Sequence, residues 1–214
     1  MINDLKLGLK LLKYSFNFKL NVISGAIFFT ISIVWCFLPN LAQLTPMYLT
    51  LIGLQIQQML ISLQFSDMVL SSPRKREIQI SVAVTAGVLG SLFSYALTSG
   101  VIFFCYKIGV REEPQFGILI LCGVLLLECM VYEVLWQKMG TVAVIIFILM
   151  FFGSVLWFLS LGNQVLREIS FGTAVGIGLA EILLGAVLQY LTARLTYRLP
   201  VKNNSMLQAI LKYK

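Results

Sequence analysis

The chain has 214 residues, of which 59% are hydrophobic and only 12% are charged, and its mean hydropathy is +0.91. A soluble domain of this size needs more charged side chains than these to cover its surface. A disordered chain is much less apolar. We therefore expect an integral membrane protein. A net charge of +7 would favour nucleic acid as the partner of a soluble protein, but here membrane topology must account for it first.

A membrane-spanning helix needs roughly 20 mostly apolar residues, because bilayer hydrocarbon is about 30 Å thick. Six segments meet this requirement, which predicts an all-α membrane protein with spans near residues 20–38, 47–68, 79–105, 116–136, 141–161 and 172–192. The third segment is long enough to tilt or to extend beyond the bilayer. We expect one membrane domain over residues 1–214, made of an interfacial segment (1–19), a six-helix part (20–199) with a cytoplasmic loop (66–79), and a cytoplasmic tail (200–214).

The N-terminal segment has apolar residues at helical spacing, Leu5, Leu9, Leu12 and Phe16, with lysines between them. This pattern is typical of an amphipathic helix that lies in the membrane interface. A cleaved signal peptide is the alternative, but residues 38–46 offer no clear small-x-small cleavage site and five more spans follow.

The second span is the most polar one. Gln55, Gln58 and Ser62 share one helical face, and Gln57 and Gln64 lie on another. Because lipid cannot hydrogen-bond these amides, the helix must face protein or a wet pathway. Interhelical hydrogen bonding without any role in transport is an equal alternative.

The loop after the second span carries the most informative cytoplasmic stretch, Ser71, Ser72, Pro73, Arg74, Lys75, Arg76 and Glu77, which we call the basic segment. Ser72 can cap a short helix that begins at Pro73, so an ordered helical knob is expected. Alternatively, its three cations merely stop transfer and anchor to anionic lipid.

Carboxyl groups inside a membrane are costly, and Glu128 and Glu181 are the deepest of them. Glu128 and Tyr132 are four residues apart and can hydrogen-bond, whereas Glu133 is expected to reach water near the cytoplasmic boundary. For Glu128 and Glu181 we weigh structural hydrogen bonding, which is favoured, against a role in binding substrate or protons.

Small residues surround Glu181 in the sixth span. Ala174, Gly178 and Gly185 share its face, so a neighbouring helix is expected to approach closely there. Gly172 and Gly176 form a GxxxG pattern on another face, which is weak evidence for dimerisation.

The distribution of cations predicts the orientation. With both termini on one side, that side carries 13 basic residues, namely Lys6, Lys10, Lys13, Lys19, Arg74, Lys75, Arg76, Lys138, Arg194, Arg198, Lys202, Lys212 and Lys214. The other side carries Lys107, Arg111 and Arg167. Cations are retained on the cytoplasmic side, so both termini and the basic segment are expected to be cytoplasmic.

Histidine is absent, which excludes Ser-His-Asp and Cys-His catalysis and the HExxH zinc helix. Cys36, Cys105, Cys122 and Cys129 all fall in apolar stretches without CxxC spacing, so we interpret them as small buried hydrophobic residues; a Cys36–Cys105 bridge is the less favoured reading. The chain also lacks a GxxxxGK[ST] loop. We therefore expect no enzyme, no bound cofactor and no metal, and any ATP that drives the protein must be bound by another polypeptide.

An amphipathic elbow, six spans and the Ser-Ser-Pro-Arg-Lys-Arg-Glu turn together resemble the membrane subunit of type-two ATP-binding-cassette exporters, especially the short permeases of bacterial peptide-export and self-immunity systems. The resemblance covers the whole chain, but only residues 71–77 are a local match. It implies that residues 71–79 form a coupling helix in a groove of a separate ATPase, which holds ATP and magnesium. It also implies a second membrane subunit, identical or related. One departure is the connection between the last two spans, because residues 162–171 are too few for the sizeable re-entrant helices common in that family.

The predicted function is thus the membrane-spanning subunit of an ATP-driven exporter in the bacterial plasma membrane, with no nucleic-acid partner. The resemblance implies an amphipathic peptide, a lipid or a drug-like molecule as cargo. The alternative is an ion-coupled carrier or small channel in which Glu128 or Glu181 binds the coupling cation, since neither has an obvious intramembrane cation as its partner. A small membrane enzyme is the least favoured class, because no nucleophile and base are paired.

Overall fold

The computed structural model describes residues 18–37, 45–64, 71–109, 116–162 and 168–199, with Lys10, Lys13, Ser15 and Leu166 as isolated positions. Within these residues the chain is helical and has no strand. The helices are α2 (Phe18–Cys36), α3 (Thr45–Gln64), α5 (Lys75–Glu77), the π-helical turn η2 (Ile78–Val82), α6 (Ala83–Lys107), α7 (Ile118–Met139), α8 (Thr141–Trp157), the π-helical turn η3 (Phe158–Gly162) and α10 (Phe171–Thr196). Most of the predicted interfacial segment (1–19), the first part of the 66–79 loop and the C-terminal tail lie outside the described residues.

Five helical stretches are long and apolar enough to cross a membrane: Phe18–Trp35, Lys75–Lys107, Ile118–Trp136, Thr141–Ser160 and Phe171–Thr196. They correspond to five of the six predicted spans, and they mark the chain as a multi-pass membrane protein by length and composition. α3 matches the remaining predicted span in position and, with 20 residues, in length. α3 is not among the five candidate spans because its glutamines lower its mean hydropathy.

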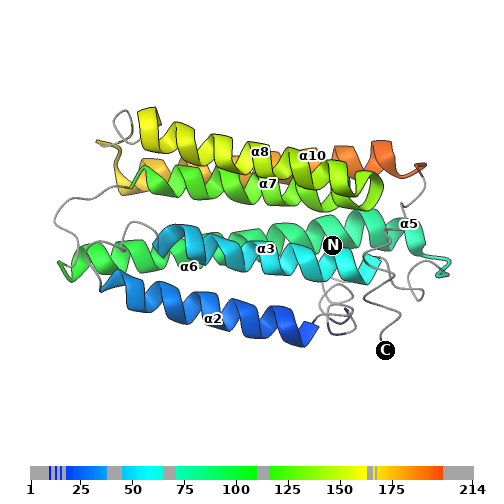
Figure 1. Cartoon of the computed structure of the whole chain (residues 1–214), viewed down its shortest axis with the longest axis horizontal. Coiled ribbons are helices and arrows are strands. Elements are labelled where there is room, and N and C mark those ends of the chain that lie inside the picture. The colour runs from blue at the N-terminus through cyan, green and yellow to red at the C-terminus, as the bar shows by residue number, and fades with distance from the viewer. Residues whose placement is uncertain are drawn as a thin grey trace.

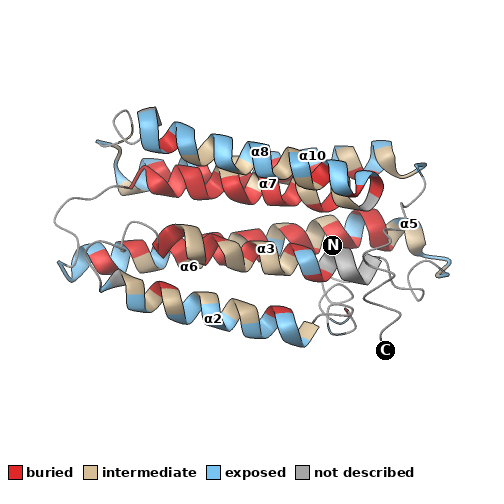
Figure 2. Cartoon of the chain, viewed as in Figure 1, coloured by how far each residue is buried: buried red, intermediate tan, exposed pale blue. Residues whose placement is uncertain are grey.

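The helices run antiparallel in chain order along one common axis (Figure 1). The most extensive contacts join α7 to α10, α2 to α3, and α3 to α6, and α7 also packs on α3 and α8. α7 is therefore central, with 67% of its span buried, whereas only 11% of the α2 and α8 spans is buried (Figure 2). The exposed apolar side chains of α2 and α8 are what lipid-facing helices require.

Small residues allow α7 and α10 to approach each other closely. A β-carbon added to Gly123 of α7 would lie 2.8 Å from the Cα of Gly178 and 3.0 Å from its carbonyl oxygen, and one added to Gly185 would lie 3.1 Å from the Cα of Leu127. Ala174, Gly178 and Gly185 are all buried. The close approach expected on the Glu181 face is confirmed, and van der Waals contact between backbones holds this pair together.

The turn between α7 and α8 consists of one residue. Gly140 ends the first helix and precedes the second, and its φ of 56° lies in a region that L side chains rarely adopt. A glycine at this position therefore allows two neighbouring spans to reverse direction without a loop.

Residues Lys75–Lys107 form one uninterrupted helix of 33 residues, in which α5, η2 and α6 follow one another. At about 1.5 Å per residue its length is about 50 Å, well beyond the thickness of bilayer hydrocarbon. The prediction that this stretch exceeds a simple span is confirmed. We call its two ends, and the corresponding ends of the bundle, the Arg74 end and the Lys107 end.

Candidate functional site

The basic segment lies at the Arg74 end and leads directly into the long helix. Arg74 is exposed, and its Nε donates a 2.7 Å hydrogen bond to Glu77 Oε2 while its Nη2 donates to Oε1, so the two side chains form a bidentate pair. Ser71, Pro73 and Arg76 are also exposed, and Ser72, Lys75 and Glu77 are half-buried. The segment therefore presents an ordered polar surface at the end of a rigid helix, rather than a separate helix.

The expected helix start is wrong by two residues. The helix begins at Lys75 instead of Pro73, and no side chain caps it. Ser72 Oγ instead accepts from the backbone N–H of Arg74 at 3.2 Å, and Ser72 O accepts from Lys75 N at 3.1 Å. Ser72 and Pro73 thus form a turn before the helix, because the serine hydroxyl satisfies a donor inside that turn.

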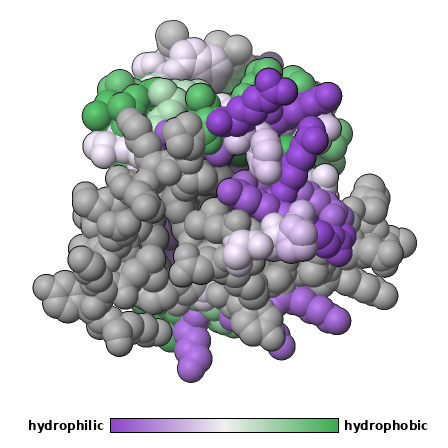
Figure 3. Space-filling model, turned by 90° about the vertical axis from the view of Figure 1, so that its right-hand side faces the viewer, coloured by the Kyte–Doolittle hydropathy of each residue, from purple (hydrophilic) through white to green (hydrophobic). Residues whose placement is uncertain are grey.

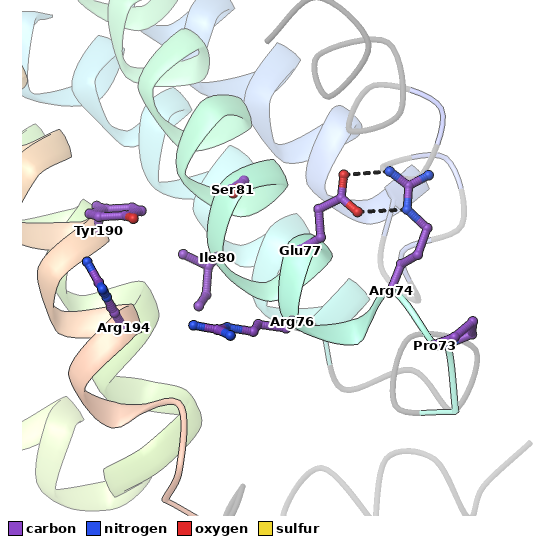
Figure 4. Close-up of a pocket in the computed structure, with 8 residues that line it drawn as sticks. All are labelled: Pro73, Arg74, Arg76, Glu77, Ile80, Ser81, Tyr190 and Arg194. Carbon is purple, nitrogen blue, oxygen red and sulfur yellow. Dashed lines mark hydrogen bonds and ion pairs between the residues drawn. The ribbon is translucent and has the colours of Figure 1, made fainter.

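A groove of about 480 Å³ separates the start of the long helix from the end of α10. Arg76 and Ile80 line one wall, and Tyr190 and Arg194 of α10 line the other (Figure 4). Among the described residues that line the groove, Glu77 is the only acidic one, and Arg74 binds it on the side away from α10. Hydrophilic side chains gather on this end of the molecule (Figure 3).

A second polar feature is a buried junction of three amide and carboxyl side chains, which we call the glutamine junction. Gln57 of α3 donates to the carbonyl oxygen of Gly87 in α6 at 3.3 Å, and Gln189 of α10 donates to Glu133 Oε2 of α7 at 2.8 Å. A β-carbon on Gly87 would lie 3.1–3.2 Å from both glutamine amides. Gln57, Glu133 and Gln189 are each 0% exposed. The junction thus links four helices, as interhelical hydrogen bonds do in membranes.

The expectation that Glu133 reaches water is wrong. Its carboxyl group is enclosed by α10 and receives the amide of Gln189, which the sequence alone could not place beside it. On α3, Gln57 is the buried glutamine, whereas Gln55 is half-buried and Gln58 is exposed. The side chain of Ser62 lies outside the described residues, so the predicted Gln55–Gln58–Ser62 face is described only in part.

Glu128 lies at the middle of α7 and is buried. Its Oε1 accepts a 2.6 Å hydrogen bond from Ser154 of α8, and its Oε2 is buried without a partner among the described residues. The expected bond to Tyr132 is absent within the described part of the chain. Tyr132 instead packs its ring on Phe147, with 4.4 Å between centroids. Glu128 and Tyr132 therefore do not act as a pair.

Glu181 of α10 packs against Gly123 of α7, next to the contact between Gly178 and Tyr95 of α6; we call this set of residues the Glu181 notch. Its Oε2 occupies the space that a Gly123 side chain would need, and this oxygen is buried without a hydrogen-bond partner in the described chain. Tyr95 is 1% exposed, covers Gly178, and bonds through its hydroxyl to the Ala174 carbonyl at 3.3 Å. Glu181 as a whole residue is only half-buried, although its Oε2 is enclosed.

Four residues of these features were not predicted as site residues from the sequence: Tyr95, Gln189, Tyr190 and Arg194. Gln189 carried a signal, because an amide within a predicted span demands a partner. Tyr190 and Arg194 gave none, since only the packing of α10 beside the long helix brings them to the groove. Cys105, Cys122 and Cys129 are buried thiols, as predicted.

Comparison with protein-family models, with curated proteins and with solved structures finds no match to this chain.

Proposed function

We propose that this chain is the membrane-spanning subunit of an exporter driven by a separate ATPase, which contacts the basic segment. The observation that carries the proposal is the continuity of the exposed polar turn at residues 71–74 with the 33-residue helix that follows it. A force applied to that turn acts directly on a helix long enough to cross the bilayer. A slack loop at the same position would dissipate such a force.

The distribution of charge supports a cytoplasmic position for that turn. Among the described residues at the helix ends, the Arg74 end carries Lys19, Arg74, Lys75, Arg76, Lys138, Arg194 and Arg198, whereas Lys107 is the one basic residue at the other end. This asymmetry follows the positive-inside rule. It supports six spans with α3 as one of them. An even number of crossings places the start of α2 and the end of α10 on the same side of the membrane.

The exposure of Gln58 and the partial exposure of Gln55 support a second membrane subunit beside α3. Exposed amides facing lipid are costly, and a partner helix or a wet pathway between two subunits would satisfy them. The second subunit is an identical or related chain. The cargo that fits a pathway of this kind is an amphipathic peptide, a lipid or a drug-like molecule.

Gentle detergent extraction from native membranes tests the proposal. A nucleotide-binding protein should co-purify with the chain, and Arg74→Glu should release it. The double variant R74E/E77R restores the local ion pair in reverse order, so it should also release the ATPase if docking depends on the charge at position 74. Retention of the ATPase by both variants, or purification of the native chain alone, would overturn the proposal.

An ion-coupled carrier is the second candidate, and the buried, unpartnered oxygen of Glu181 favours it. A coupling cation or proton would satisfy that oxygen. Vesicles that contain only this chain distinguish the two candidates. Uptake that follows an imposed proton or sodium gradient without nucleotide, and that Glu181→Gln abolishes, would establish the carrier and exclude the exporter.

A further inference from the structure

The groove at the Arg74 end has an unbalanced charge. Arg76 extends toward α10 from one wall and Arg194 rises from the other, and neither forms an ion pair with any described residue (Figure 4). Arg74 already binds the carboxyl group of Glu77. Two guanidinium groups that share one hollow repel each other unless an anion lies between them.

An aromatic ring holds the Arg76 side chain at this place. The guanidinium carbon of Arg76 lies 5.9 Å from the centroid of the Tyr197 ring, a cation–π distance. Tyr190, one turn before Arg194 on the same face of α10, adds a hydroxyl group to the wall. The groove therefore presents two planar guanidinium groups and a hydroxyl group, which are hydrogen-bond donors that suit phosphate oxygens.

An exposed apolar track leads from the membrane to this groove. Leu183 and Val187 lie seven residues before Tyr190 and Arg194, respectively, which is two helical turns on the same face. They are 59% and 54% exposed, so the track faces lipid. Leu195, beside Arg194, is also exposed. Tyrosine and arginine at the end of such a track mark the level of the phospholipid headgroups.

We propose that this groove binds the phosphate headgroup of an anionic phospholipid, with Arg76 and Arg194 as the two charged donors and the acyl chains along Leu183 and Val187. Arg74 and Arg76, two residues apart, then act differently: Arg74 faces outward with Glu77, and Arg76 faces the lipid. The bound lipid joins the start of the long helix to α10. This inference goes beyond the proposed exporter function and requires only that the chain resides in a membrane.

Lipid retention by the purified chain tests the proposal. The chain is reconstituted in vesicles of phosphatidylcholine and phosphatidylglycerol in a four-to-one ratio, extracted in mild detergent, and examined by native mass spectrometry. One phosphatidylglycerol should remain on each wild-type chain. The double variant R76Q/R194Q should bind it about thirtyfold more weakly, because each basic residue at an anionic surface contributes about a factor of five.

The matched control is R198Q/K107Q, which removes the same charge from residues that do not line the groove and should retain phosphatidylglycerol. Equal retention by the two double variants would overturn the proposal. Arg194→Gln alone changes one exposed side chain, so its partial loss of lipid supports the site even if the double variant misfolds. Displacement of phosphatidylglycerol by inorganic phosphate at equal concentration would identify a free-anion site and also overturn it. The ATPase co-purification described above is a separate readout, so failure of one proposal leaves the other testable.

Discussion

The glutamine junction and the Glu181 notch are both polar sites between α6, α7 and α10, but their polar groups differ in burial and in hydrogen bonding. In the junction, Gln57, Glu133 and Gln189 are completely enclosed, and each donates or accepts a hydrogen bond across a helix interface. In the notch, glycines and a tyrosine bring backbones together, and the buried Oε2 of the half-buried residue Glu181 has no described partner. The junction links helices through two hydrogen bonds, although the side-chain oxygens of Gln57 and Gln189 have no described partner. In the notch, no described hydrogen bond reaches the buried oxygen, and it belongs to a carboxyl group, which can carry a charge.

The difference separates structural polar residues from candidate functional ones. A side chain that is enclosed and hydrogen-bonded stabilises the bundle and cannot readily bind anything else. A carboxyl group that is partly accessible and incompletely bonded remains available to a cation or a substrate. Glu133 belongs to the first kind and Glu181 to the second, although both occupy the same helix pair.

The largest effect on the notch should come from Gly178→Ala. The added methyl group would overlap the buried ring and hydroxyl of Tyr95, so the free energy of unfolding should fall by about 2 kcal/mol. Gly176→Ala is the matched control, because nothing lies within 4 Å of an added β-carbon there. Unfolding in mixed detergent measures both. Equal stability of the two variants would show that Tyr95 does not pack on Gly178.

A smaller loss is expected at the junction. Gln189→Leu removes the amide that donates to Glu133, and the free energy of unfolding should fall by about 1 to 2 kcal/mol. A double-mutant cycle with Glu133→Ala, which removes the acceptor oxygen, should give a coupling energy of about 0.6 kcal/mol or more. Gln58→Leu, at an exposed position on α3, is the control and should not weaken the isolated chain. A coupling energy near zero would show that Glu133 and Gln189 do not stabilise each other.

Glu181→Gln should change stability little. The amide keeps the volume of the carboxyl group, and the change in unfolding free energy should stay within about 0.5 kcal/mol. Glu128→Gln is the comparison, because Glu128 already accepts a hydrogen bond from Ser154. Transport after reconstitution is the informative measurement. Loss of transport in Glu181→Gln alone, with normal assembly, would place the notch in the pathway, and full transport would make it structural.

The smallest effect concerns Lys138, which follows the apolar span of α7. Its Nζ donates to the Leu199 carbonyl at 3.0 Å, and burial lowers its pKa below the ordinary value of 10.5, with Lys75 lowering it further. The unfolded chain then binds this proton more tightly than the folded one. Stability should therefore rise as the pH increases through the folded-state pKa toward 10.5 and level off above that. Lys138→Met should flatten this rise, and an unchanged slope in thermal unfolding would contradict the assignment.

The positions of the helices were largely predictable from the sequence. Runs of about 20 apolar residues fix where α2, α7, α8 and α10 lie, because the length of a span is set by the thickness of the bilayer. Local detail was harder. The start of the long helix was misplaced since Ser72 has both a capping and a turn-forming hydrogen bond available, and the sequence does not state which one forms.

Partners across helices were the least predictable part of the candidate site. The face of small residues around Gly178 predicted close approach correctly, because small side chains let two helix backbones come together, whereas Gly172 and Gly176 on another face of α10 have no neighbour among the described residues. The partner of Glu133 and the position of Arg194 in the groove depend on which helices are neighbours and on how each helix is rotated about its own axis. Neither follows from periodicity along a single helix.

Site-specific photo-crosslinking in native membranes identifies what contacts the exposed turn at residues 71–74. A photoreactive amino acid at Ser71 samples the exposed turn of the basic segment, and one at Ile108 samples the opposite end of the same long helix. If an ATPase contacts the basic segment, position 71 should capture a separate polypeptide that binds ATP, with a yield that changes when ATP is added, and position 108 should not. Capture of lipid alone at position 71, or of the same polypeptide at both positions, would contradict that contact.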